Sequence, residues 1–244
     1  MEPNRISRRV FLGASMVTAA GVALGAGRAS AEAPPESGLS SEGLLVGLPG
    51  FQPRTVAPLA HEEVAGFLSR AQLAAHHAEY VKAVEALKAA EGALATVDRT
   101  PAGSAAYAAL RRKQVAAANE MLLHEFYFRN LATDPVELPR YLKPHMREHM
   151  GSLASWAEDF KACALAAKAW ALLVYDPYDD RWHNVIMDGD ADGTWIGANP
   201  LVVCDVSEHA YRTDYARKED YVAKFLERVD WAEVASRYKK VDRM

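Results

Sequence analysis

The sequence contains only two cysteines, Cys163 and Cys204, and both lie in apolar segments. Two cysteines are too few for the disulfide framework that stabilises small secreted domains. We therefore interpret both as core residues, with one disulfide between them as the lesser alternative. The sequence also lacks a run of basic residues, which argues against nucleic acid as a partner.

A long hydrophobic run is also missing from the N-terminal region, where the apolar stretch 17–26 is too short and too rich in Gly and Ala for a membrane span. Paired arginines in SRRVFLGAS (7–15) precede it, and the small residues RASAEA (28–33) follow. This order is typical of a twin-arginine export signal cleaved after Ala31, with an uncleaved anchor as the alternative. We therefore expect a periplasmic or secreted protein that has no stable membrane association after cleavage of residues 1–31.

The next part of the chain predicts an extended segment and then a helical hairpin. Residues 32–60 are rich in Pro, Gly and Ser, which is typical of an extended lead-in. Helical spacing begins after Ser69, a good N-cap, and continues to about Leu94. After the break RTPAGS (99–104), a second helix is expected to run to about Leu131. Two long helices with a short connection predict an antiparallel hairpin domain over 61–134.

The remaining residues, 135–244, have the pattern of an α+β domain. The segment ATDPVELP (132–139) marks its start, and three short apolar runs separated by turn residues predict an antiparallel three-stranded sheet. The predicted strands are 169–176, 183–188 and 199–205. The predicted helices are 140–149, 152–166, 207–215, 218–227 and 230–239. The fold class expected is therefore α+β, with an N-terminal antiparallel helical hairpin followed by this C-terminal domain.

An unusual pair of polar residues follows the third apolar run. Asp205 ends that run, and His209 lies four residues later in LVVCDVSEHAY (201–211). Positions i and i+4 at a helix start face the same way, so the two side chains are candidate metal ligands. The alternative is that Asp205 caps the helix, but a cap does not account for His209.

His124 is a third candidate ligand, because it lies on a helix face of large apolar residues and a buried imidazole needs a partner. A core histidine satisfied by other groups is the alternative. The sequence has no Glu followed by His three residues later, which excludes a ferritin-like di-iron site. His145 and His149 are also spaced i, i+4, but their charged neighbours indicate a solvated face.

Several segments resemble the iron/manganese superoxide dismutase family. DVSEHAY (205–211) is similar to the family signature Asp-x-Trp-Glu-His-Ala-aromatic, and NEMLLHEFYFRNL (119–131) is similar to the motif of its second helix. GSLASW (151–156), the segment around Trp170 and YVAKFLERVDWAEVASRY (221–238) follow in the family's order. The resemblance covers nearly all of 60–240.

This resemblance implies a centre with one Fe or Mn ion, held by three His and one Asp, that converts superoxide to oxygen and hydrogen peroxide. His124, Asp205 and His209 correspond directly to three of the ligands, and N/O ligands of this kind suit Fe or Mn. For the first ligand, aligning HHAEYV (76–81) with the family motif selects Gln72, whereas aligning the helix start selects His76. The separation from the second ligand favours His76, and His77 is the lesser candidate.

The sequence also departs from the family near the expected centre. Ser207 replaces the signature Trp, and Val84 occupies the position of the gateway Tyr, although Tyr80 lies one turn nearer to His76. Glu120 stands where one version of the family has a Gln, and the segment 170–200 contains no Gln. Glu120 and Tyr80 are therefore the candidate catalytic residues. An ionised Glu120 cannot donate a hydrogen bond as Gln does, whereas a protonated one can; pairing with a nearby Arg or Lys is the alternative.

The resemblance further implies a homodimer, because in the family the Glu beside the last ligand reaches the partner's ligand His, and Glu208 and His209 retain that pair. The departures leave a second functional hypothesis, a dismutase-fold protein that binds metal with little or no dismutase activity. An unrelated metal-dependent oxidoreductase on the same fold is the third.

Overall fold

The computed structural model describes residues 54–194 and 196–241, so the export signal predicted over 1–31 and most of the lead-in predicted over 32–60 lie outside the described residues. Residues 54–60 have no regular secondary structure, as expected for the end of the lead-in. Within the described residues, every helix is too short or too polar to cross a bilayer.

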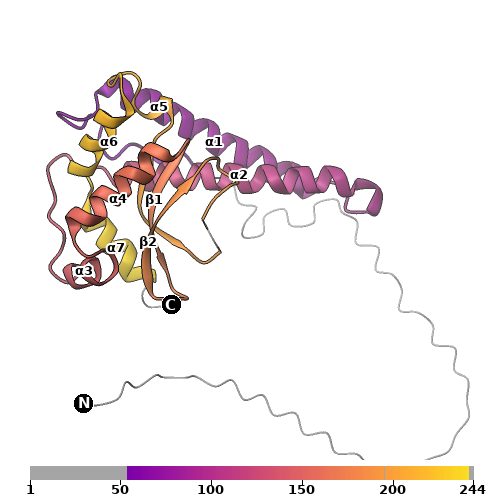
Figure 1. The fold of residues 1–244 in the computed structure, drawn as a ribbon. Coiled ribbons are helices and arrows are strands. Elements are labelled where there is room, and N and C mark those ends of the chain that lie inside the picture. Colours follow the sequence, from indigo (N-terminus) through magenta and orange to yellow (C-terminus); the bar gives the residue numbers. More distant parts are fainter. Residues whose placement is uncertain (1–53, 195, 242–244) are drawn as a thin grey trace, which may run out of the picture. The chain divides into compact units, whose positions relative to one another are not determined.

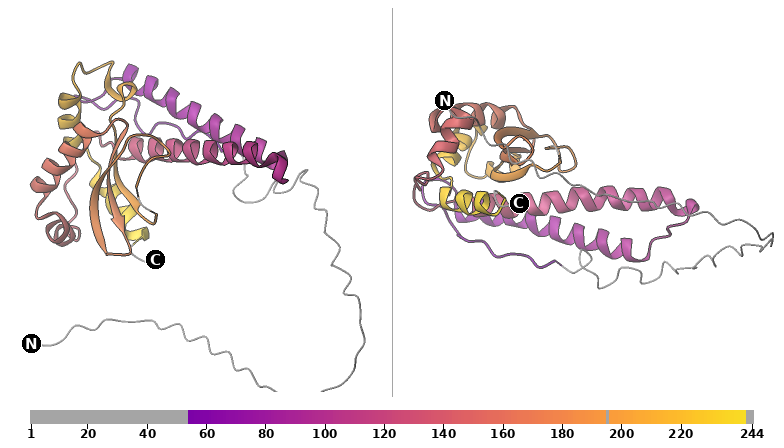
Figure 2. Two further views of the ribbon diagram at one scale, coloured as in Figure 1. Left: turned by 45° about the vertical axis from the view of Figure 1, so that its right-hand side comes forward. Right: turned by 90° about the horizontal axis from the view of Figure 1, so that it is seen from below.

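Two long helices form the hairpin predicted from the sequence. Helix α1 spans Arg70–Thr96 and helix α2 spans Ser104–Arg129, with the short 3-10 helix η1 (Pro101–Gly103) between them. The two helices lie side by side in both views of Figure 2. Ser69 is the N-cap of α1, as predicted, and its hydroxyl accepts a hydrogen bond from the backbone N–H of Gln72 at 3.1 Å. Such a cap satisfies one of the free N–H groups in the first helical turn.

The second part of the fold is built on a three-stranded antiparallel sheet (Figure 1). Its strands are β1 (Trp170–Asp176), β2 (Arg181–Met187) and β3 (Asn199–Asp205), in the spatial order β2-β1-β3. The central strand β1 is buried along its whole length, which explains its continuous apolar run. Residue Trp170 pairs with Asp205, so the end of β3 lies beside the start of β1. The α+β class predicted from the sequence is confirmed.

Helices cover this sheet and connect it to the hairpin. The helices are α3 (Lys143–Met150), α4 (Leu153–Ala166), α5 (Glu208–Tyr211), α6 (Lys218–Glu227) and α7 (Trp231–Val241). Helix α4 contacts β1 and β2, whereas α2 and α7 contact β3. Because α2 packs directly on β3, the open end of the hairpin, where α1 begins and α2 ends, comes close to the end of the sheet.

A buried polar network joins α2, β3 and α7. The Arg237 guanidinium of α7 donates hydrogen bonds to the Asn130 side chain at 3.0 Å and to the carbonyl of Leu201 at 3.0 Å. The Asn130 side-chain oxygen also accepts from the Val203 N–H at 2.9 Å. Asn130 and Arg237 are both buried. Buried polar groups of this kind hold a fixed geometry because leaving one unpaired is costly.

Two local predictions were wrong. The helix expected over 207–215 ends at Tyr211, because the following residues bond to α1 instead: the Thr213 N–H donates to the Gln72 side chain, and the Asp214 carboxylate accepts from the Ser69 hydroxyl. The histidines expected on a solvated face, His145 and His149, are half-buried. Their rings pack against Trp182, with centroids 6.2 and 5.7 Å away.

Candidate metal centre

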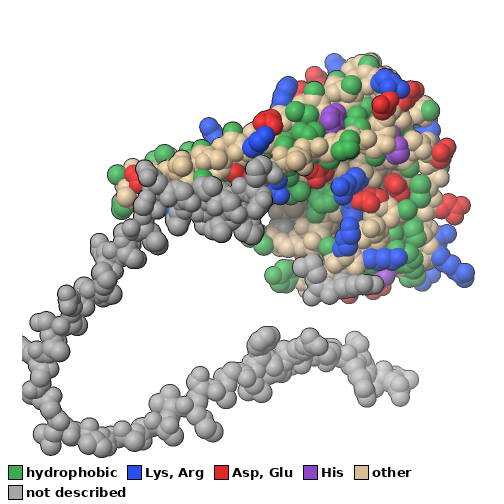
Figure 3. Space-filling view, turned by 180° about the vertical axis from the view of Figure 1, so that it is seen from behind, with side chains coloured by type: hydrophobic (Ala, Val, Ile, Leu, Met, Phe, Trp, Pro, Cys, Tyr) green, Lys and Arg blue, Asp and Glu red, His purple; other side chains and the backbone are tan. Residues whose placement is uncertain are grey.

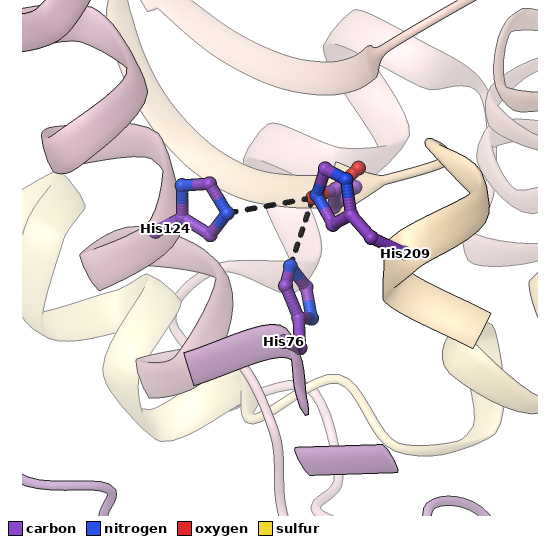
Figure 4. Close-up of side chains that lie close together, drawn as sticks. His76, His124 and His209 are labelled. Atoms are coloured by element: carbon purple, nitrogen blue, oxygen red, sulfur yellow. Dashed lines mark hydrogen bonds and ion pairs between the residues drawn. The ribbon is translucent and has the colours of Figure 1, made fainter. Parts of the chain in front are cut away.

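Four side chains from four elements meet at one point, as Figure 4 shows for the three histidines. His76 comes from α1, His124 from α2, Asp205 from the last position of β3, and His209 from α5. The Asp205 Oδ2 atom lies 2.8 Å from His76 Nε2, 2.9 Å from His209 Nε2 and 3.8 Å from His124 Nε2. One nitrogen or oxygen from each residue lies within 4.8 Å of those of the other three. The structure thus brings together the four residues that the sequence singled out.

Two hydrogen bonds hold Asp205 in place. Its second oxygen, Oδ1, accepts a hydrogen bond from the Ser207 N–H at 2.8 Å, and its carbonyl accepts from the Tyr221 hydroxyl at 2.8 Å. The first contact is the cap-like bond considered from the sequence, but it uses only one carboxylate oxygen. The other oxygen faces the histidines, so Asp205 bonds to the turn and contributes to the cluster at the same time.

The protonation of His124 follows from its hydrogen bond. Its Nδ1 lies 2.8 Å from the backbone carbonyl of Glu120, and a carbonyl can only accept, so Nδ1 carries the proton. Burial lowers the pKa of His124 from 6.5 to about 4, against the opposing charge of Asp205. The ring is therefore neutral at pH 7, and its Nε2 has a free lone pair directed at the cluster. That Nε2 is buried and has no hydrogen-bond partner among the described residues.

Of the other three groups, Asp205 and His209 form a charged pair, and His76 is a second neutral imidazole. Burial opposes ionisation of Asp205, but hydrogen bonds from His209 and His76 outweigh it and hold the Asp205 pKa far below its usual range. Burial likewise lowers the pKa of His76, which is fully enclosed. His209 is 36% exposed, so the Asp205 hydrogen bond and charge outweigh its burial, and its pKa is raised.

This arrangement fits a metal ion. A core histidine without a ligand would not leave a buried Nε2 unpaired, because an unpaired buried polar atom costs about 1–3 kcal/mol. The donor set consists of three imidazole nitrogens and one anionic carboxylate. Nitrogen and oxygen donors of this kind can bind Fe or Mn. Metal binding would displace the protons that His76 and His209 share with Asp205.

The two other candidates for the first position lie outside the cluster. The Gln72 amide donates to the carbonyl of His209 at 2.7 Å, so it supports the backbone of α5. The ring of His77 points to the lead-in, where its Nε2 donates to the carbonyl of Ala57 at 2.9 Å. Of the three alternatives open from the sequence, only His76 faces His124, Asp205 and His209.

The candidate catalytic residues Glu120 and Tyr80 lie close to the cluster. The Glu120 side chain is half-buried, and no ion pair joins it to Arg or Lys within the described ranges. Burial, followed by the charge of Asp190, raises the Glu120 pKa. The buried Tyr80 ring lies 6.3 Å from that of His124, but its hydroxyl donates to Glu125 and accepts from the Ala57 N–H, both at 2.9 Å.

Sequence reasoning missed Asp190, which lies in the loop after β2. The Trp170 indole N–H donates to the Asp190 carboxylate at 3.0 Å, and the Trp170 ring packs edge-on against His124 with centroids 5.1 Å apart. The Asn119 amide of α2 donates to the Asp190 carbonyl at 2.6 Å. The only sequence signal was the acidic turn DGDADG (188–193), in the region that contains no Gln.

Comparison with known proteins points to one family. Residues 139–237 match the C-terminal domain of iron/manganese superoxide dismutases. A superoxide dismutase [Fe] from Cupriavidus metallidurans is 34% identical over 163 residues, which cover 65% of this chain and 82% of that protein. A superoxide dismutase [Mn] 2 from Haloferax volcanii is 37% identical over 121 residues, 49% of this chain and 61% of that protein.

The match to the two Haloferax volcanii relatives spans about three fifths of their length. The match to the Cupriavidus metallidurans protein is longer and includes most of that protein. With the α+β fold and the His/Asp cluster, these similarities establish that the chain belongs to the iron/manganese superoxide dismutase family.

Proposed function

We propose that this protein is a superoxide dismutase that uses one Fe or Mn ion held by His76, His124, Asp205 and His209. The observation that carries the proposal is the convergence of these side chains on Asp205 Oδ2, together with the unpaired Nε2 of His124. A bound metal would supply one-electron redox chemistry between the +3 and +2 states, with one superoxide oxidised to oxygen and a second, which also takes up two protons, reduced to hydrogen peroxide. Relatives are named for both metals, so the choice between Fe and Mn stays open.

The chain's own residues prepare this site in different ways. The Asp205 carboxylate supplies the negative charge that offsets the cation, and the Ser207 N–H keeps its orientation. The Glu120 carbonyl fixes the tautomer of His124, so that Nε2 is available without loss of a proton. Trp170 closes one side of the His124 ring and excludes water there.

Glu120 is the residue that we expect to limit activity. An ionised Glu120 cannot donate the hydrogen bond that Gln donates; burial raises its pKa, but only the protonated fraction can act as Gln does. Glu120→Gln should make this donor permanent and raise the rate of superoxide consumption at neutral pH. Unchanged activity and unchanged metal content in this variant would show that Glu120 is a bystander.

We further propose that the protein is exported and forms a homodimer through α5. Glu208 and His209 are adjacent and exposed, so both are available to a second copy of the chain. Sedimentation at micromolar concentration should give a dimer, and a monomer would contradict this assembly. Replacing Arg8 and Arg9 with Lys should retain the protein in the cytoplasm, whereas continued export would refute twin-arginine targeting.

The alternative is a metal-binding protein of the same fold with little or no dismutase activity, which the departures at Ser207, Val84 and Glu120 favour. Metal analysis and a superoxide-consumption assay on one natively exported sample distinguish the two. About one Fe or Mn per chain with rapid superoxide consumption supports the dismutase, and metal without consumption supports the alternative. Absence of both metals would overturn the proposed centre.

A further inference from the structure

A cavity of about 600 Å³ lies between α3, the start of α4 and the start of α7. Its lining is mostly apolar: Leu138, Met146 and Trp231 line it and are buried by the surrounding chain. Leu153, the first residue of α4, also lines it and is 41% exposed, so the cavity opens to solvent on that side. Small-molecule sites in proteins usually have a volume of about 300–1,000 Å³ and a lining of this kind. The cavity therefore suits a small molecule with an apolar body.

Two basic side chains line the same cavity. Lys143 and Arg147 are four residues apart on α3, so they lie on one face of that helix. Both are exposed, and neither side chain makes an ion pair or a hydrogen bond with another residue in the described part of the chain. The start of α4, which also borders the cavity, has no acidic side chain in its first turn. Free positive charge thus stands beside the apolar lining.

One carboxylate lines the cavity as well. Glu137 is exposed, and no ion pair joins it to Lys143 or Arg147. Two cations and one carboxylate leave a local excess of positive charge. The whole chain, by contrast, has a formal net charge of −4, and basic and acidic side chains are interspersed over the described part of the face in Figure 3. Since no broad field draws anions to the protein, recognition of an anion here depends on the charges of the cavity itself.

The cavity is separate from the metal centre. It shares no lining residue with the cluster of three His and one Asp. In Figure 1, α3 lies at the lower end of the helices that cover the sheet, whereas α5 lies at the upper end. The contact proposed above between two copies of α5 therefore does not involve the cavity.

We propose that this cavity binds a small organic carboxylate with an apolar body. The carboxylate lies between Lys143 and Arg147, and the body lies against Met146 and Trp231. A carboxylate suits the two cations because it accepts charge-assisted hydrogen bonds from both. The body gains free energy when its apolar surface leaves water. A neutral molecule of the same shape should bind more weakly, because it leaves the two cations without a counter-charge.

Isothermal titration of the purified protein with 2-naphthoate and with 2-naphthylmethanol separates charge from shape, because the two molecules share an aromatic body and only the first is an anion. Octanoate tests an alkyl body in place of the aromatic one. We expect saturable binding of 2-naphthoate, octanoate or both with a Kd below about 1 mM, and binding of 2-naphthylmethanol about fivefold weaker than that of 2-naphthoate. Chelator-treated protein should give the same affinities, since the cavity contains no residue of the metal centre.

Charge variants locate the site. Lys143→Gln and Arg147→Gln should each weaken carboxylate binding by about three- to fivefold, as expected for loss of one exposed charge about 4 Å from the ligand, and leave 2-naphthylmethanol binding unchanged. Glu137→Gln removes the opposing charge and should strengthen carboxylate binding. Lys113→Gln is the matched control, because it removes a basic charge from an exposed position on α2 and should change neither affinity. All four positions are exposed, so thermal unfolding of each variant should match that of the unmodified protein.

The outcomes test the cavity without involving superoxide. Opposite shifts for Lys143→Gln and Glu137→Gln, with no shift for Lys113→Gln, support the carboxylate site. The proposal is overturned if neither carboxylate binds with a Kd below about 1 mM, or if the variants change binding of the acid and the alcohol equally. Binding that weakens as the protein concentration is raised would show that a second copy of the chain fills the cavity, which also overturns it. Each of these failures leaves the proposed dismutase function untouched.

Discussion

The buried neutral imidazole of His124 makes the stability of the metal-free protein depend on pH. The pKa of His124 is about 4 in the folded state and 6.5 when the group is unperturbed, so between these values the unfolded chain binds a proton that the folded chain does not. The free energy of unfolding should therefore fall as the pH is lowered from 6.5 to 4. Replacement of His124 by Leu removes this titrating group and should make the fall in stability less steep.

The size of the effect follows from the pKa difference. Each pKa unit corresponds to about 1.4 kcal/mol, so His124 alone should remove on the order of 3 kcal/mol across this range. The other two charged groups act outside the range. Asp205 has a depressed pKa, so the stability that it contributes is lost only below pH 3.8. His209 has a raised pKa, so the stability that it contributes is lost only above pH 6.5. His76 acts in the same direction as His124 and remains in the variant.

Urea unfolding of chelator-treated protein at several pH values between about 4.5 and 7 measures the difference. Relative to His124→Leu, the unmodified protein should lose about 1.4 kcal/mol for each pH unit. Leu123→Ala is the matched control, because it removes a buried neighbour on the same helix at a cost of about 2–5 kcal/mol without removing a titratable group. Its curve should run parallel to that of the unmodified protein. If the curve for His124→Leu also ran parallel to that of the unmodified protein, the neutral, buried state of His124 would be refuted.

Three further predictions address the centre and the core. Asp205→Asn removes the anionic ligand and should lower Fe and Mn content at least tenfold with an unchanged far-UV spectrum, whereas full metal content would contradict its role as a ligand. In the native protein a thiol reagent should modify only the half-buried Cys163 and reach the enclosed Cys204 after denaturation, because both are free thiols; two reactive thiols before unfolding would contradict this. Asn130→Ala leaves polar groups of β3 and α7 without a partner and should destabilise the protein by about 2–4 kcal/mol in urea, and an unchanged midpoint would argue against the network.

Local patterns in the sequence were sufficient to predict much of this fold. The hairpin followed from helical spacing and a Pro-Gly break, and the N-cap at Ser69 followed from its side-chain chemistry. The apolar runs located all three strands, although β2 begins at Arg181, two residues before its predicted start. Asp205 and His209 were recognisable together because one short strand-to-helix junction contains both.

Other features depended on contacts between residues distant in the sequence. The choice of His76 over Gln72 was settled by the packing of α1 against α5, which turns the Gln72 amide toward the His209 backbone. The position of Asp190 beside Trp170 likewise depends on how the loop after β2 folds back over α2. Neither contact leaves a periodic signal, because spacing along the chain records which residues share a face but not which faces meet. The sequence by itself therefore determined the elements and the chemical types of the candidate ligands, whereas only the tertiary structure decided which side chains converge and which charges surround them.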